Sequence, residues 1–458
     1  MKKVSKRALA VLALTFAVLL GMGAFVLRYF LHGADWAVFP GNPHTYSSGI
    51  LNSGILTDRS GTVVLDATEG RKYAEDATLR KAMLHLLGDR EGYIAAPMLQ
   101  EYADQLVGYN FLTGTYHLTD KASTGKLTIS ASAQQKALEA LGGRAGTVGV
   151  YNYKTGEILC AVSSPTYDPD QVPDIAGDTS GAYNGVYVNR FFNATFVPGS
   201  IFKLVTTAAA LETLPDAASL SYQCNGSFDV EGDTVNCNGV HGAVDLKGAL
   251  AHSCNVAYGQ LALQLGPEVL TAYAEKLGVT DSFFVDGYHT AKGNFDLSDA
   301  PNVDVAWSGI GQYTDMINPC GFLRMMGVIG GGGEAAEPYL MASVDSTSLL
   351  GDYRAKTETT GRLLDATTCQ TLTDMMRNNV QQIYGQGNFG DLPVCAKSGT
   401  AEVDSDRMPH ATFAGFVADP NCPLAFIVVV ENAGSGSAVC ASIAGAVLQE
   451  CAAVLAAE

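Results

Sequence analysis

The first long apolar run of the chain extends from Ala8 to Leu27 and contains nothing more polar than Thr15. Its twenty residues are enough for a helix that crosses the hydrocarbon core of a bilayer. A group of basic residues precedes the run: Lys2, Lys3, Lys6 and Arg7. By the positive-inside rule these residues stay in the cytoplasm and the rest of the chain is exported, which predicts a single-pass anchor in the cell membrane. A cleaved signal peptide is the alternative, but the run is longer than the usual apolar core and no clear cleavage site follows it.

Beyond the anchor, the apolar positions form shorter groups separated by turn residues. A turn at residues 58–61 lies between two apolar runs, and residues 97–107 have helical spacing. From about residue 146 the alternation of apolar runs and turn residues becomes clearer. We therefore divide the chain into a cytoplasmic tail with its anchor (1–31), a small extracytoplasmic pedestal module (32–143) and a main domain (144–458).

The main domain opens with a hairpin pattern. Apolar runs at 147–151 and 157–162 flank a Lys-Thr-Gly turn at 154–156. A buried helix, two late strands and an Ala-rich closing helix follow at 202–214, 413–417, 424–430 and 438–457. Strands at both ends of a domain with helices between them predict an α+β fold whose sheet joins early and late segments.

Composition narrows the class of protein. Hydrophobic residues make up 47% and charged residues 16% of the chain, as expected of a globular protein rather than a disordered or many-span one. The formal charge of −18 would repel phosphate backbones, so we exclude nucleic-acid partners. The ten cysteines are too few for a disulfide scaffold. Cys224 and Cys237 bracket a short polar stretch, and we predict that they can form a disulfide after export.

Three short motifs carry the candidate chemistry. They are SIFK at 200–203, SCN at 253–255 and KSGT at 397–400, and in this order they match the SxxK, SxN and K[ST]G set of serine acyl-enzymes. Each motif alone is weak evidence. A second SxxK occurs at 123–126 and a second KTG at 154–156, and we interpret both as structural.

The residue types suit nucleophilic acyl transfer. We predict Ser200 as the nucleophile and Lys203, one helical turn further on, as the base that takes its proton. Lysine acts as a base only when neutral, and burial together with the charge of Lys397 would lower the pKa of Lys203. Ser253 would pass a proton to the leaving amine. Asn255 would bind a substrate amide because its side chain both donates and accepts.

The KSGT segment is assigned to substrate binding as a whole, Gly399 included. The hydroxyls of Ser398 and Thr400, with Lys397, would hold a substrate carboxylate. The backbone N–H groups of Ser200 and Thr400 would form an oxyanion hole.

Other reactive side chains are given ordinary roles. We interpret His241 and His252 as structural or surface histidines, Trp307 as a core residue and Glu402 as a solvated carboxylate. No clustered His, Cys and Asp set has catalytic metal-ligand spacing, so we expect no metal and no cofactor.

The chain resembles the class B penicillin-binding proteins, in a compact form, over nearly its whole length. The segment FVPGSIFK at 196–203 is similar to the PGSxFK box of that family, and further similar stretches lie at 54–61, 127–129, 155–159, 163–169, 311–312 and 397–402. The chain departs from the family pattern at Tyr313, where Gly is usual, and at Asn318-Pro319, where Thr-Pro is usual.

The resemblance implies an all-helical subdomain on a five-stranded antiparallel sheet, and a D,D-transpeptidase that cross-links peptidoglycan stem peptides and is acylated by β-lactams. It also implies a polytopic SEDS-family glycan polymerase as partner. It does not separate roles in division, elongation and sporulation.

Two other functions remain open from the motifs. A β-lactamase-like hydrolase shares the acylation residues but needs a group that activates water. A non-catalytic β-lactam sensor usually has several spans and a cytoplasmic effector, whereas about seven residues precede the span here. The anchor and the pedestal module favour the transpeptidase over both.

Overall fold

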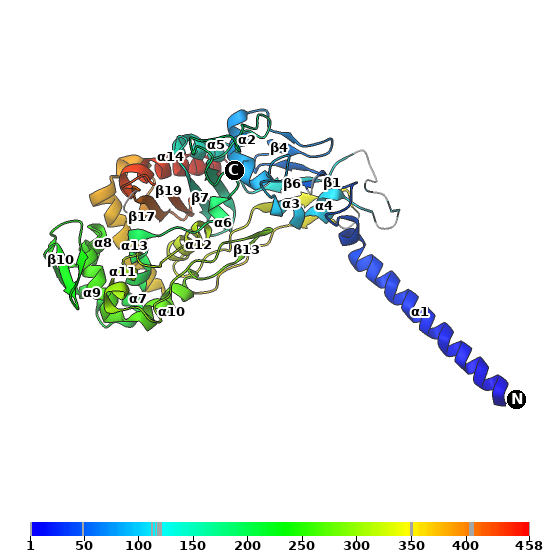
Figure 1. Cartoon of the computed structure of the whole chain (residues 1–458), viewed down its shortest axis with the longest axis horizontal. Helices are drawn as coiled ribbons and strands as arrows, with labels where there is room; N and C mark the ends of the chain where they lie inside the picture. The colour runs from blue at the N-terminus through cyan, green and yellow to red at the C-terminus, as the bar shows by residue number, and fades with distance from the viewer. Residues whose placement is uncertain are drawn as a thin grey trace.

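The computed structural model describes residues 2–47, 50–110, 113–114, 116, 121–348, 351–402 and 407–457. The chain begins with a long apolar helix, α1 (Lys2–Ala37), which projects from the rest of the molecule in Figure 1. Within the described residues, two helices have the length and composition to cross a membrane: the 3–33 part of α1 and α14 (Gly436–Ala456). Since α14 packs in the protein core, α1 is the candidate anchor, and it contains the predicted span at residues 8–27.

The central sheet has the strand order β17-β18-β19-β7-β8, and all neighbouring strands are antiparallel. Its strands come from two distant parts of the chain: β7 (Gly146–Asn152), β8 (Ile158–Ser164), β17 (Val394–Ala401), β18 (His410–Val417) and β19 (Leu424–Val430). The last strand, β19, pairs with the first, β7, over seven residues, from Leu424↔Asn152 to Val430↔Gly146. The predicted five-stranded sheet that joins early and late segments is therefore confirmed.

Helices cover both faces of this sheet, which is why every residue of β7, β8 and β19 is buried. Successive side chains of a strand point to opposite faces. Val428 packs in the cluster that includes α5 (Ala131–Leu141) and α14, and Ile427 packs in the cluster that includes α12 (Pro319–Gly330). The covered sheet gives the catalytic motifs a rigid support.

The helical subdomain lies between β8 and β17 in the sequence. Its helices are α7 (Lys203–Thr213), α8 (Leu246–Ala251), α9 (Asn255–Leu265), α10 (Pro267–Lys276), α11 (Asn302–Ser308), α12 and α13 (Ala366–Asn379). It is not all-helical as the resemblance implied. Two small sheets pair β9 (Ser221–Cys224) with β12 (Gly242–Asp245), and β10 (Ser227–Val230) with β11 (Asp233–Asn236). Positive φ at Glu231 and Gly232 forms the tight turn of the second hairpin.

A second sheet has the order β16-β15-β6-β3-β4-β5. Four of its strands come from the predicted pedestal, and two come from the segment around residue 350: β3 (Ile55–Thr57), β4 (Val63–Asp66), β5 (Lys72–Tyr73), β6 (Thr124–Leu127), β15 (Met341–Asp345) and β16 (Tyr353–Arg354). The SxxK at 123–126 lies in this sheet, where the Ser123 hydroxyl bonds that of Thr347 at 3.2 Å. The boundaries 1–31, 32–143 and 144–458 stay a prediction.

Most of the remaining elements of the chain are shorter. The predicted helix at 97–107 is split at Tyr102 into two short helices. The elements of this kind are β1 (Tyr46–Ser47), β2 (Ile50–Leu51), α3 (Pro97–Glu101), α4 (Ala103–Val107), α6 (Arg190–Asn193), η2 (Ala217–Ser219), β13 (Phe284–Val285), β14 (Tyr288–His289), η3 (Val380–Tyr384) and η4 (Gln386–Phe389).

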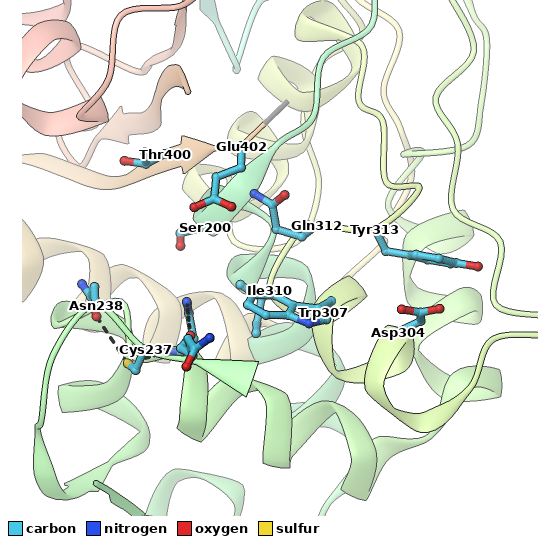
Figure 2. A pocket seen from close by; sticks show the side chains of 12 residues that line it. Ser200, Cys237, Asn238, Asp304, Trp307, Ile310, Gln312, Tyr313, Thr400 and Glu402 are labelled. Atoms are coloured by element: carbon cyan, nitrogen blue, oxygen red, sulfur yellow. Dashed lines mark hydrogen bonds between the residues drawn. The ribbon is translucent and has the colours of Figure 1, made fainter. Parts of the chain in front are cut away.

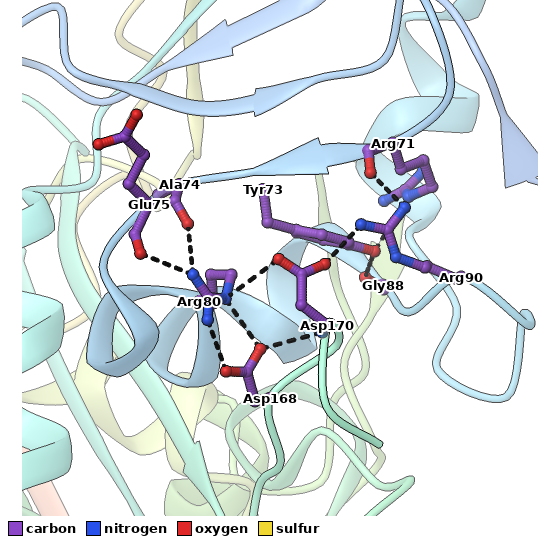
Figure 3. A network of polar contacts seen from close by, with 9 residues as sticks. All are labelled: Arg71, Tyr73, Ala74, Glu75, Arg80, Gly88, Arg90, Asp168 and Asp170. Atoms are coloured by element: carbon purple, nitrogen blue, oxygen red, sulfur yellow. Dashed lines mark hydrogen bonds and ion pairs between the residues drawn. The ribbon is translucent and has the colours of Figure 1, made fainter.

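An ionic junction joins α2 (Ala77–Leu87) to the loop after β8 (Figure 3). Arg80 contacts both carboxylate oxygens of Asp168, at 2.8 Å and 2.6 Å. It also lies 3.4 Å from Asp170, which pairs with Arg90 at 2.5 Å. The junction connects the first part of the chain with the catalytic part.

Candidate active site

Ser200 lies in the 3-10 turn η1 (Gly199–Ile201), directly before α7, which confirms the helix predicted there. The turn packs against β17 because of two glycines. A Cβ on Gly199, whose φ is +57°, would lie 2.7 Å from the carbonyl oxygen of Thr400. A Cβ on Gly399 would lie 2.7 Å from that of Pro198. Only glycine permits this close approach, which places Ser200 in the η1 turn beside Thr400 in β17.

The three motifs meet at the hydroxyl of Ser253. Its oxygen accepts hydrogen bonds from Nζ of Lys203 at 3.2 Å and from Nζ of Lys397 at 3.1 Å. Lys203 also donates to the backbone oxygen of Ser253 and to Oδ1 of Asn255, both at 2.8 Å. Lys397 donates to the backbone oxygen of Ser398 at 2.7 Å. Residues predicted from three separate segments thus form one network.

Ser200 lies outside that network. It is partly exposed, and no hydrogen bond joins its hydroxyl to Lys203 within the described part of the chain. The sequence predicts that the Lys203 amine reaches this hydroxyl, and the structure places the two residues one turn apart without that contact.

Both lysines are fully buried, and no ion pair to a carboxylate is found for either among the described residues. Burial, and after it the charge of Lys397, holds the pKa of Lys203 well below its usual range. Burial lowers the pKa of Lys397 to about 7. A lysine in this setting has a neutral amine available near neutral pH, as a general base requires.

The SxN motif lies in a strained turn between α8 and α9. Ser253 has a φ of 53°, a conformation that costs a non-glycine residue about 1 kcal/mol or more. Its backbone N–H donates to Leu250 at 3.2 Å, and that of Cys254 donates to Ala249 at 2.9 Å. Cys254 then caps α9 by accepting from the N–H of Ala257 at 3.4 Å. These contacts orient the Ser253 hydroxyl toward Lys203 and Lys397.

Ser398 is held by Tyr384, a residue that sequence reasoning missed. The backbone N–H and the hydroxyl of Ser398 both donate to the Tyr384 hydroxyl oxygen, at 3.0 Å and 3.1 Å. Burial raises the pKa of Tyr384, so it stays neutral. No motif marks Tyr384 in the sequence, because it comes from the separate turn η3. The hydroxyl of Thr400 lies 3.5 Å from the N–H of Gly436.

Two adjoining cavities of about 530 and 490 Å³ open over this network. Ser200, Asn255, Thr400 and Glu402 line both of them. Figure 2 shows the first cavity, with Ser200, Thr400 and Glu402 on one side and Trp307 on another. Trp307, predicted as core, is only partly buried and borders the cavity. The cleft is large enough for a peptide end to reach Ser200.

The predicted Cys224–Cys237 disulfide is not formed in this structure, where both residues are free thiols. They converge instead with His241 and Cys254, and the four ligand atoms lie within 4.8 Å of one another. Sequence reasoning missed this cluster because it treated the histidine and the cysteines separately. The spacing Cys-x12-Cys-x3-His-x12-Cys was the available signal.

The covered antiparallel sheet and the convergence of SxxK, SxN and KSG define a serine acyl-transfer site of the penicillin-binding type. In agreement, residues 146–449 match the penicillin binding protein transpeptidase domain family. The chain belongs to this family.

Among characterised proteins, the chain is similar to the peptidoglycan D,D-transpeptidase PbpA of Mycolicibacterium smegmatis. The two are 29% identical over 360 residues, which cover 70% of this chain and 71% of the relative.

Two solved structures share the fold. Penicillin-binding protein A from M. tuberculosis, solved as a ceftriaxone acyl-enzyme complex, has a TM-score of 0.75 at 23% identity, over 87% of this chain and 98% of the other. The D,D-transpeptidase domain of a peptidoglycan glycosyltransferase from Eggerthella lenta has a TM-score of 0.74 at 24% identity, over 88% and 98%.

Proposed function

We propose that the chain is a membrane-anchored peptidoglycan D,D-transpeptidase that acts through an acyl-enzyme on Ser200. One observation carries this proposal: the Ser253 hydroxyl is shared by two buried lysines that lack a carboxylate partner in the described chain. The PbpA relative carries this activity in its name, and the solved penicillin-binding protein A is an acyl-enzyme with a β-lactam.

The acylation step uses the network as follows. The Ser200 oxygen attacks the carbonyl of the penultimate D-Ala while the neutral Lys203 amine takes the hydroxyl proton. The backbone N–H groups of Ser200 and Thr400 hold the oxyanion. The C–N bond then breaks, and Ser253 passes a proton from the lysines to the departing D-Ala amine. An amine of a second stem peptide attacks the ester in turn and restores the Ser200 hydroxyl.

The remaining site residues bind the substrate. Asn255 offers an amide to the donor peptide, and Lys397, Ser398 and Thr400 hold its terminal carboxylate, with Gly399 keeping β17 close to the Ser200 turn. Penicillin carries a carboxylate and a reactive amide in a similar arrangement, so it would enter the same site.

The function is tested by supplying the full chain with a peptide that ends in D-Ala-D-Ala and with a labelled D-amino acid acceptor. We expect an exchange product that is absent for Ser200→Ala. Turnover of penicillin without exchange would favour the β-lactamase-like hydrolase, and lasting penicillin labelling without exchange or turnover would favour the sensor. Both results would contradict the proposal.

We also propose that α1 anchors the enzyme in the cell membrane, with the catalytic part outside. Long apolar side chains of α1 are exposed along its length, for example Leu12 at 69% and Phe16 at 64%, and lipid would cover them. A reporter at the C-terminus should be active only outside the membrane, and cytoplasmic activity would sink the assignment.

A polytopic SEDS-family glycan polymerase is the proposed partner, with α1 and residues 34–140 as the contact surfaces. Co-purification from membranes should fall when the anchor is swapped and those residues are deleted. Unchanged co-purification would refute the assignment.

A further inference from the structure

A cluster of soft ligands borders the active-site cleft. Cys224 ends β9, Cys237 follows β11, His241 precedes β12 and Cys254 caps α9. Nδ1 of His241 lies 3.5 Å from Sγ of Cys224 and 3.6 Å from Sγ of Cys237. The sulfurs of Cys237 and Cys254 are 3.8 Å apart.

These distances suit a tetrahedral metal ion. Zinc binds thiolate at about 2.3 Å and imidazole at about 2.0–2.1 Å, so tetrahedral angles place two sulfurs about 3.8 Å apart and a sulfur and a nitrogen about 3.5–3.6 Å apart. All four ligand atoms fall within 4.8 Å of one another. A Cys₃His set is a common structural zinc site, and soft thiolates disfavour magnesium and calcium.

The hydrogen bonds to the sulfur atoms are those expected of thiolate ligands. The backbone N–H of Asn255 donates to Sγ of Cys237 at 3.2 Å, and that of Ala257 donates to Sγ of Cys254 at 3.4 Å. Such bonds stabilise the negative sulfur that a metal needs. Cys224 and Cys254 are buried, whereas Cys237 and His241 are partly exposed, which leaves a path for the ion.

A disulfide would explain the position of fewer of the four side chains than a metal ion does. It would use two thiols and leave a third thiol and an imidazole turned toward the same point. The sulfurs of Cys237 and Cys254 would also have to move from 3.8 Å to about 2.05 Å.

We propose that Cys224, Cys237, His241 and Cys254 form a structural zinc site that holds the SxN turn of this enzyme.

The site acts on catalysis through position, and this part rests on the proposed function. Cys254 stands between Ser253 and Asn255, so fixing its sulfur fixes the strained turn that aims the Ser253 hydroxyl. Cys237 follows Asn236, whose carbonyl oxygen accepts from Nδ2 of Asn255 at 3.0 Å. Figure 2 shows Cys237 at the edge of the cavity that Ser200 also lines. The ion would thus hold the SxN turn in place through Cys254 and the segment that hydrogen-bonds Asn255 through Cys237.

The first experiment measures metal on the full chain, purified in detergent without added metal. We expect about one zinc per chain by elemental analysis. After chelation, cobalt(II) should give sulfur-to-metal charge-transfer bands and the strong visible bands of a tetrahedral site. Cys237→Ser and His241→Ala should weaken zinc binding by more than about 100-fold, beyond the 10–100-fold typical of outer-shell changes.

Matched variants make the result specific. Cys422 is a buried free cysteine outside the cluster, and His252 stacks on His241 at 5.3 Å without joining the four ligands. Cys422→Ser and His252→Ala should keep the metal, and His241→Cys should restore it as a Cys₄ site. Equal zinc in Cys237→Ser and the wild type would overturn the proposal. So would a Cys237 disulfide in freshly extracted chain that binds no zinc.

The second experiment tests position. Removing zinc from the wild type should slow penicillin acylation by at least about tenfold, re-addition should restore the rate, and His241→Cys should recover it. An unchanged rate after verified zinc loss would overturn the positioning role. Zinc content is read without any activity, so the failure of the site and the failure of the transpeptidase assignment are told apart.

Discussion

The cleft around Ser200 and the junction around Arg80 both hold cations away from water, but they treat the charge in opposite ways. At the junction, Arg80 meets both oxygens of Asp168, and their side chains are 11% and 6% exposed. In the cleft, Lys203 and Lys397 are fully buried, and within the described part of the chain their hydrogen-bond partners are neutral oxygens.

The presence or absence of a carboxylate partner decides whether a buried cation is stable or reactive. The hydrogen bond to Asp168 raises the pKa of Arg80, while burial depresses the pKa of both lysines. A buried cation with a carboxylate stays charged and adds rigidity; without one it gives up its proton more readily. Burial therefore contributes to stability at the Arg80 junction and to catalysis in the Ser200 cleft.

Replacing the base should have the largest effect. Lys203→Met removes the amine at similar volume and should slow acylation by penicillin by about 10² to 10⁴. Lys203→Arg keeps a cation and its donors but cannot lose a proton, so it should be as slow. Stopped-flow labelling gives the rates, and circular dichroism checks the fold. A rate within tenfold of wild type for the Arg variant would rule out the base role.

Breaking the junction should cost stability but little chemistry. Asp168→Asn leaves Arg80 without its main partner and should lower the free energy of unfolding by about 3 kcal/mol. The hydrogen bond from Arg80 lowers the pKa of Asp168, so this contribution is full above the unfolded pKa of about 3.9 and is lost as pH falls through the lower folded value. Urea unfolding at pH 7 measures it. An unchanged midpoint would contradict the assigned role of the pair.

Removing the second lysine should move the activity along the pH axis. The charge of Lys397 lowers the pKa of Lys203, so Lys397→Met should raise that pKa. The acid limb of the acylation profile should then shift to higher pH. The profile is best recorded with a ligand that lacks a carboxylate, since Lys397 also binds that group. A limb that stays in place or moves down would contradict a repulsion between the two amines.

The smallest effect is expected at the rim of the junction. Arg90 and Asp170 form a pair with side chains 40% and 34% exposed. Asp170→Asn should cost less than about 1 kcal/mol, in contrast to Asp168→Asn, and less still in high salt. The same urea assay compares the two variants directly. Equal losses would remove the distinction between buried and exposed pairs.

The sequence predicts what depends on local spacing. The apolar runs place β7, β8, β18 and β19, and the three motifs predict which polar residues meet in the cleft. Local patterns succeed there because strands and helices reflect their own periodicity.

Contacts between separate segments that no motif marks were beyond that reasoning. Tyr384 reaches Ser398 from a separate turn, and β15 joins β6 from more than two hundred residues away. The cysteine cluster was missed for the same reason: its ligands come from two small sheets and a helix cap. None of these contacts leaves a periodic trace in the sequence.

Acylation of Ser200 is tested by the mass of the peptides obtained after the full chain reacts with penicillin. We expect one adduct, on the peptide that contains Ser200, which is lost in Ser200→Ala and kept in Ser123→Ala, the variant that alters the other SxxK. An adduct that survives Ser200→Ala, or that is found on Ser123, would contradict this expectation.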